Sequence, residues 1–158
     1  MEHLKDLVNN YLMASAFIAW FVAQIIKVVV GLFDKEDRRN IFHVMFSTGG
    51  MPSSHSSAVT ALCISAAIME GLGSPIFAIT FILAGVVMID ASGVRYETGK
   101  QAQIINKITK KLFSENSQEV NAGLKELVGH TPFQVLMGSI LGFATAIVMG
   151  FVMGYLHI

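Results

Sequence analysis

Four apolar stretches alternate with polar connections along this chain. The stretches run from Tyr11 to Phe33, His55 to Leu72, Pro75 to Tyr96 and Pro132 to Leu156. A helix needs roughly 20 residues to cross the hydrocarbon layer of a bilayer, and the second stretch is the shortest of the four. The pattern therefore predicts about four transmembrane helices, the second of which begins within or near the membrane interface.

The polar connections predict how these helices are joined. Residues 71–75 read Gly-Leu-Gly-Ser-Pro, a helix-stopping turn that makes an antiparallel hairpin of the second and third stretches. The other two connections, residues 34–52 and 97–131, hold most of the charged residues. In the second of them, apolar residues recur twice at helical spacing, first at Ile104, Ile105, Ile108 and Leu112 and then at Val120, Leu124, Leu127 and Val128. We expect two amphipathic surface helices there.

Composition agrees with a membrane protein. Hydrophobic residues make up 53% of the chain and charged residues 14%, which is more apolar and less charged than a typical soluble domain. We therefore expect an all-α integral membrane helical bundle, built as a single domain over residues 1–158 with an amphipathic insert at about 97–131. The net charge is zero and no basic stripe is interleaved with aromatic residues, so no nucleic-acid partner is expected.

Four crossings place both termini on one side of the membrane and both long connections on the other. The connection side carries Lys35, Arg38, Arg39, Arg95, Lys100, Lys107, Lys110, Lys111 and Lys125, with Lys27 buried toward it. Lys5 alone lies on the far side. Because basic residues concentrate on the cytoplasmic side of membrane proteins, we expect the long connections of this multi-pass protein to face the cytoplasm.

Polar residues that are unusual in a membrane protein gather on that same side. Lys27 lies near the end of the first helix, and Arg38 and Arg39 follow it. Pro52-Ser53-Ser54-His55 opens the second helix, Arg95 closes the third, and His130 precedes the fourth. Two helix N-termini offer unpaired N–H groups and the positive end of the helix dipole. Because cationic side chains and histidines lie beside these N-termini, we expect phosphate to be the bound ligand.

The motifs that carry these residues resemble a known family. The stretch from Gly49 to Ser57 resembles the Pro-Ser-Gly-His motif of the type 2 phosphatidic acid phosphatase and vanadium haloperoxidase superfamily, and is most similar to its divergent membrane branch. Lys27 with Arg38 or Arg39 resembles the first motif of that superfamily. Its third motif is supplied by Arg95, His130, Val135, Gly138 and Gly142. The resemblance covers most of the chain and implies a helical bundle that hydrolyses phosphomonoesters or pyrophosphates, typically of lipids.

The resemblance also implies a role for each residue. His130 would be the nucleophile that forms a phosphohistidine, and His55 would protonate the leaving oxygen. The implied phosphate-binding residues are Lys27, Arg38, Arg39, Gly50, Ser53, Ser54 and Arg95. Such an enzyme would be a metal-independent lipid phosphatase, and we expect neither a metal nor a cofactor. The sequence contains no His and Cys cluster with zinc spacing and no Walker-type loop.

One position departs from the expected chemistry. Gln134 stands where the superfamily has the aspartate that orients the nucleophilic histidine. Asp90, Glu97 and Glu126 are the other candidates for the orienting role, and Asp90 is alternatively a partner of Arg95 or Lys27. An amide does not stabilise an imidazolium as a carboxylate does. Two alternatives therefore stay open: a non-catalytic protein of the same fold that binds anionic lipid or phosphate, and a small transporter or assembly factor.

The expectation that the far halves of the helices lack polar residues argues against the transporter hypothesis. The expected partners are a phosphorylated lipid or other phosphate substrate and the membrane itself, and a homo-oligomer is left open.

Overall fold

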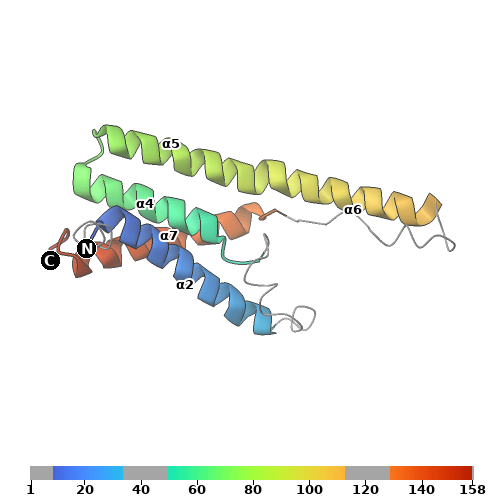
Figure 1. The fold of residues 1–158 in the computed structure, drawn as a ribbon, viewed down its shortest axis with the longest axis horizontal. Coiled ribbons are helices and arrows are strands. Elements are labelled where there is room, and N and C mark those ends of the chain that lie inside the picture. Colours follow the sequence, from blue (N-terminus) through green and yellow to red (C-terminus); the bar gives the residue numbers. More distant parts are fainter. Residues whose placement is uncertain (1–8, 34–49, 113–128, 158) are drawn as a thin grey trace, which may run out of the picture.

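The computed structural model describes residues 9–33, 50–112 and 129–157 and shows a bundle of helices (Figure 1). No strand occurs in these three ranges, which confirms the expected all-α class. In chain order the elements are α2 (Tyr11–Phe33), α4 (Ser54–Glu70), α5 (Pro75–Ile89), the π-helical turn η1 (Asp90–Val94), α6 (Arg95–Leu112) and α7 (Pro132–Val152).

The helix ends follow from local side chains. Ser53 caps α4 and Ser74 caps α5, because each side chain accepts a hydrogen bond from a backbone N–H in the first turn of its helix. Gly71 ends α4 with a φ of 82°, a left-handed conformation that favours glycine. The tight turn and the hairpin of α4 and α5 are therefore as predicted, and α2 has the predicted bounds.

The predicted end of the third helix is wrong. Instead of stopping at Tyr96, α5 passes through η1 into α6, so one helical rod runs from Pro75 to Leu112. No proline interrupts residues 76–112, and the extra residue of a π-helical turn is accommodated within η1 without ending the helix. The first predicted surface helix is thus α6, the direct continuation of α5. The second, around residues 120–128, lies outside the described residues.

Three of the described helices are long and apolar enough to cross a membrane: Tyr11–Gly31, Pro75–Thr109 and Pro132–Val152. Their outward faces carry large exposed apolar side chains such as Phe17, Phe21 and Ile82, as contact with lipid requires. At 17 residues, α4 is only about 25 Å long, which is shorter than the roughly 30 Å hydrocarbon layer.

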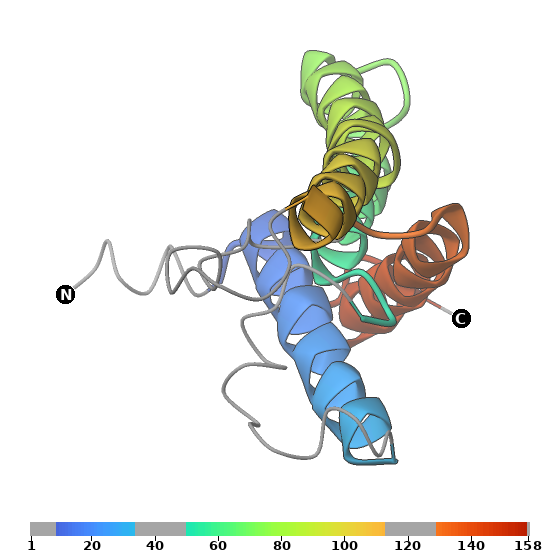
Figure 2. The same cartoon turned by 90° about the vertical axis from the view of Figure 1, so that its right-hand side faces the viewer.

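Helix α4 lies at the centre of the bundle. It packs against α2, α5 and α7, and Figure 2 shows it between the α5–α6 rod and the other two helices. Its buried residues are mostly small, and those that are polar are Ser54, Ser56, Ser57 and Ser65. The three apolar helices therefore surround a short helix that is rich in serine and would be poorly suited to contact lipid.

Small residues allow these helices to approach closely. Along α2 the buried positions are every fourth residue, namely Tyr11, Ser15, Ala19, Ala23 and Lys27. On this stripe the carbonyl of Ala19 accepts a hydrogen bond of 3.1 Å from the Ser57 hydroxyl of α4. On α7, a Cβ added to Gly138 would lie 2.3 Å from the backbone oxygen of Ser53, the cap of α4, and one added to Gly142 would lie 2.2 Å from that of Ser57 in α4. Gly138 and Gly142 therefore act as packing residues, as small residues commonly do between membrane helices.

The end of the bundle opposite Lys27 is also partly polar. The Tyr11 hydroxyl donates a 2.8 Å hydrogen bond to the Ala146 carbonyl, and its ring stacks on Tyr155. Ser15 and Ser65 are fully buried. The expectation that the far halves of the helices lack polar residues is therefore wrong, because small hydroxyl side chains occupy the tight interface between α2 and α4.

Candidate functional site

The first turns of α4 and α7 lie side by side. The backbone N–H of Ser53, the cap of α4, donates a 3.1 Å hydrogen bond to the carbonyl of Gln134 in the first turn of α7. The Ser53 hydroxyl accepts hydrogen bonds from the backbone and the hydroxyl of Ser56. Two helix N-termini thus open at the same end of the bundle, an arrangement that favours a bound anion.

His130 lies against the junction of η1 and α6. Its backbone N–H donates a 3.0 Å hydrogen bond to the carbonyl of Ala91, and the residue is only 4% exposed. A Cβ added to the preceding residue, Gly129, would lie 2.4 Å from the backbone nitrogen of Tyr96. Gly129 therefore lets the chain run close to the α6 backbone, and this contact brings His130 near Arg95.

Lys27 reaches the same end from α2. The residue is 3% exposed, and the aliphatic part of its side chain packs on Gly50, where an added Cβ would lie 3.2 Å from Lys27 Cγ. Gly50 has a φ of 93°, which an L side chain rarely adopts. Glycine at this position therefore satisfies both the backbone conformation and the close contact with the lysine.

The surroundings of His130 favour its neutral form. Burial lowers the pKa of this imidazole below its usual value, and the positive charge of Lys27 and the nearby His55 lower it further. The Gln134 side chain and the Gly50 backbone act in the opposite direction without reversing the shift. The Nδ1 atom is buried and has no hydrogen-bond partner among the described residues. The His130 imidazole is therefore buried near Lys27 and His55, in surroundings that favour the neutral form, and its Nδ1 is unsatisfied by the residues that the structure describes.

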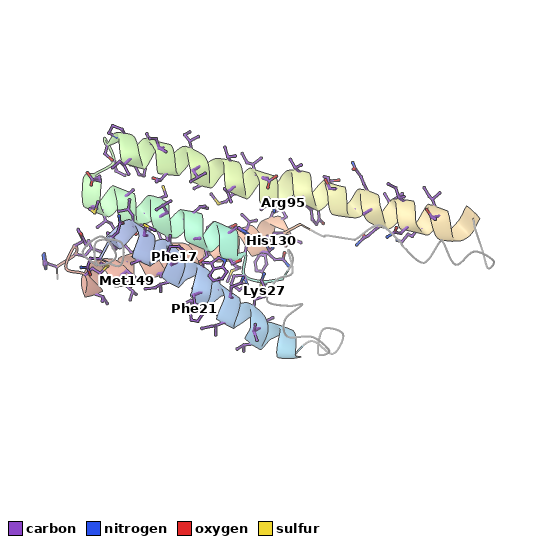
Figure 3. All side chains as sticks on the ribbon, viewed as in Figure 1. Phe17, Phe21, Lys27, Arg95, His130 and Met149 are labelled. Atoms are coloured by element: carbon purple, nitrogen blue, oxygen red, sulfur yellow. The ribbon has the colours of Figure 1, made fainter. Side chains whose placement is uncertain are left out.

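His55 and Arg95 complete the group of described residues. His55 lies in the first turn of α4, where its imidazole experiences the positive charges of Arg95 and Lys27. Figure 3 shows Lys27, Arg95 and His130 at one end of the bundle. The structure thus brings together four residues that the sequence motifs singled out, from three helices and the segment before a fourth. Arg38 and Arg39 lie outside the described residues.

Asp90 pairs with Arg95. The distance from Arg95 Nε to Asp90 Oδ2 is 2.6 Å, and both side chains are partly exposed. Of the two partners considered for Asp90, the structure gives Arg95. Because the bond uses Nε, it orients the guanidinium while leaving its terminal nitrogens for other acceptors. No three His, Cys, Asp or Glu side chains of the described ranges form a group that could hold a metal ion.

Comparison with known proteins identifies the family. A family model described as "Divergent PAP2 family" matches residues 8–145. The chain belongs to the divergent PAP2 family. It is also 37% identical over 156 residues to a protein of Bacillus subtilis (strain 168) named "Uncharacterized membrane protein YuiD", covering 92% of this chain and 98% of that protein. No solved structure matches. The predicted resemblance is thereby confirmed, and the match includes every candidate residue of this divergent PAP2 protein.

Gln134 has a structural role in this divergent PAP2 protein that sequence reasoning missed. Its Oε1 accepts a 3.0 Å hydrogen bond from the backbone N–H of Thr131, while the Thr131 hydroxyl accepts one from the Gln134 N–H. These two bonds form a capping box at the start of α7, and the Thr-x-x-Gln spacing is its sequence signature. The side chain thus fixes the helix start beside His130. Ser54, predicted to bind phosphate, is 2% exposed at the start of α4.

Proposed function

We propose that this divergent PAP2 protein is a membrane-embedded phosphatase that hydrolyses a phosphomonoester or pyrophosphate, of a lipid, through a phosphohistidine intermediate. The proposal rests on one observation: the buried His130 imidazole, with Nδ1 unsatisfied by described residues, lies within the electrostatic range of Lys27 and His55. Burial of an ionisable group with such neighbours is typical of a functional site. The cations and the two helix N-termini supply the charge that a phosphoryl group needs.

In the proposed reaction a ring nitrogen of neutral His130 attacks phosphorus. The P–N bond forms as the P–O bond to the leaving group breaks, and His55 gives its proton to the leaving oxygen. Water then attacks phosphorus, the P–N bond breaks, and His55 takes a proton from that water. Lys27 and Arg95 neutralise the phosphoryl oxygens, and Arg38 or Arg39 joins them. Ser53, Ser54 and the backbone near Gly50 supply hydrogen bonds. The reaction needs neither metal nor cofactor.

The distribution of charge supports a membrane side for the proposed reaction. The connections that flank the site carry most of the basic residues of the chain, and such connections usually face the cytoplasm. We therefore place the proposed site at the cytoplasmic face, where it would meet the headgroup of a phosphorylated lipid of that leaflet. Gly50 beside Lys27 and the first turns of α4 and α7 would form the walls around the phosphate.

A second candidate function is binding without hydrolysis. It is favoured by Gln134, whose side chain oxygen accepts the Thr131 N–H in the capping box, because an amide offers no charge to stabilise an imidazolium. In that case the same cluster would hold an anionic lipid headgroup or inorganic phosphate. The two functions share a binding site and differ in whether the P–O bond breaks.

One assay of the purified full chain separates the two functions. Phosphate release is measured from a panel of lipid phosphates and pyrophosphates, with and without a chelator, for the native chain, His130→Ala and the control variant His157→Ala. His157 is an exposed histidine outside the site. The proposal expects chelator-resistant release that His130→Ala abolishes and His157→Ala retains.

The control measurements decide between the remaining outcomes. Release that survives His130→Ala would overturn the phosphohistidine mechanism. If the native chain releases no phosphate but binds inorganic phosphate or vanadate, and His130→Ala weakens that binding, the binding function replaces the hydrolytic one.

A further inference from the structure

Helix α6 extends beyond the membrane. The continuous span from Pro75 to Thr109 has 35 residues, which corresponds to about 52 Å of helix, whereas the hydrocarbon layer is roughly 30 Å thick. Figure 1 shows α6 reaching past the ends of α2, α4 and α7. Most of α6 therefore lies outside the hydrocarbon layer if the rod runs along the membrane normal.

This protruding helix exposes an apolar face. Ile104, Ile105 and Ile108 are 56%, 47% and 51% exposed, whereas Gly99 and Ala102 are buried. With 100° between successive residues, the three isoleucines form one stripe, and Gly99 and Ala102 lie on the other side of the helix. An exposed stripe of isoleucines is unfavourable in water, so a partner surface is expected for this face.

The charge of α6 indicates what that surface is. The helix carries one acidic residue, Glu97, against the basic residues Arg95, Lys100, Lys107, Lys110 and Lys111. Lys100 and Lys107 are exposed and lie along one edge of the isoleucine stripe. Equal positive charge would make two parallel copies of α6 repel each other. A basic edge beside an apolar stripe instead complements a membrane surface that contains anionic lipid.

A bend is needed for α6 to reach the surface of its own membrane, and η1 is the place for it. This π-helical turn separates α5 from α6, and sharp bends in helices occur at such turns. Gly93 lies within it, where an added Cβ would meet nothing within 4 Å. On α5 and η1, the apolar residues Val86, Ile89 and Val94 are also exposed, and they precede the isoleucine stripe of α6 along the rod.

We propose that α6 docks, by bending at η1, onto the anionic lipid surface of the membrane that holds the bundle. The isoleucine stripe enters the interface and the lysines contact anionic headgroups. Because the carbonyl of Ala91 in η1 accepts the hydrogen bond of the His130 backbone, docking also acts on the segment that carries His130. The docking itself goes beyond the proposed phosphatase function and does not depend on it.

The test uses the full chain with Cys63→Ser, reconstituted in vesicles of phosphatidylcholine with or without phosphatidylglycerol. A polarity-sensitive fluorophore is attached at Ile104→Cys, and at Gln103→Cys as a control about 100° around the helix. We expect the fluorophore at 104 to shift to the blue and to be quenched by a lipid-borne quencher only when phosphatidylglycerol is present, with high salt reversing the change. The fluorophore at 103 should respond much less.

A charge variant completes the test. Replacing Lys107 with glutamine should lower the ratio of docked to undocked helix by roughly fivefold, since a lysine contributes about 1 kcal/mol near an anionic surface. Replacing Lys100, whose Nζ lies 3.1 Å from Glu97 Oε1, should lower it less. Three results would overturn the proposal: equal signals in the two kinds of vesicle, undiminished docking of the charge variant, or a blue shift that depends on protein density rather than on lipid, which would indicate a second copy as the partner.

Discussion

Gly138 provides the sharpest test of how packing positions the site. A Cβ at this residue would lie 2.3 Å from the Ser53 carbonyl oxygen, whereas ordinary contacts begin at 3.4 Å. The substitution Gly138→Ala therefore requires a separation of 3.4 − 2.3 = 1.1 Å between α7 and α4. The obstacle is backbone, which cannot rotate away as the end of a flexible side chain can. Overpacking of this kind costs about 1–3 kcal/mol of the free energy of unfolding.

Gly85→Ala is the matched control. Gly85 lies within α5, and a Cβ added there would meet nothing within 4 Å. Both variants gain the higher helix propensity of alanine, about 1 kcal/mol, so the difference between them isolates the clash at Ser53. Denaturation midpoints of both purified variants in detergent should show Gly138→Ala less stable than Gly85→Ala by about 1–3 kcal/mol.

The same displacement should reach the site. The Ser53 N–H to Gln134 carbonyl hydrogen bond joins the two helices one turn away from Gly138, and His130 precedes that turn. A shift of about 1 Å in a reacting group lowers a rate by about 10²-fold. Phosphate release should therefore fall by about that factor in Gly138→Ala and stay near the native rate in Gly85→Ala. If the two variants match in stability and in rate, the close contact does not position the site.

Other predictions concern charge and hydrogen bonds. Lys27→Gln removes a positive charge that lowers the pKa of His130, so the pKa of His130 should rise. Because attack needs neutral His130 and is lost as the pH falls through that pKa, the acidic limb of the pH–rate profile should move to higher pH. An acidic limb that does not move would contradict the electrostatic coupling between the two residues. Gln134→Asp places a carboxylate beside His130 and should raise the rate of phosphate release, by up to about 10⁴-fold; no increase would mean that the amide does not limit turnover. Tyr11→Phe removes the hydrogen bond to the Ala146 carbonyl and should lower the free energy of unfolding by about 1 kcal/mol without changing phosphate release, because it lies at the far end of the bundle.

The apolar pattern predicted the helices where it coincided with strong end signals. Residues 71–75 contain both a glycine stop and a serine–proline start, and α4 and α5 end and begin there. The end predicted at Tyr96 rested only on the change from apolar to charged residues. Such a change marks the membrane boundary and does not end a helix, because polar residues without a breaker remain good helix formers.

The motifs singled out the candidate site residues, but did not predict the packing that brings the described ones together. Lys27, His55, Arg95 and His130 are far apart in the chain, and their meeting depends on Gly129 and Gly138 lying on neighbouring backbones. Glycine in a sequence does not reveal which backbone it will contact. The central position of α4 was not predicted either, because a short apolar stretch indicates only a marginal membrane span when its neighbours are unknown.

The direction of the helices explains why this end of the bundle is suited to an anion. Helices α4 and α7 both begin here, since Ser53 bonds to Gln134 across their first turns, so their positive dipole ends add. Helix α2 runs in the opposite direction, with Tyr11 near Ala146 at the far end. Lys27, in the C-terminal half of α2, therefore lies at the end where α4 and α7 begin. A parallel pair flanked by an antiparallel helix thus gathers positive charge at one end. At the other end the buried polar side chains of the described residues are the hydroxyl groups of Tyr11, Ser15 and Ser65, which carry no positive charge. The described residues therefore favour anion binding at one end of the bundle and offer an anion no charged path across it.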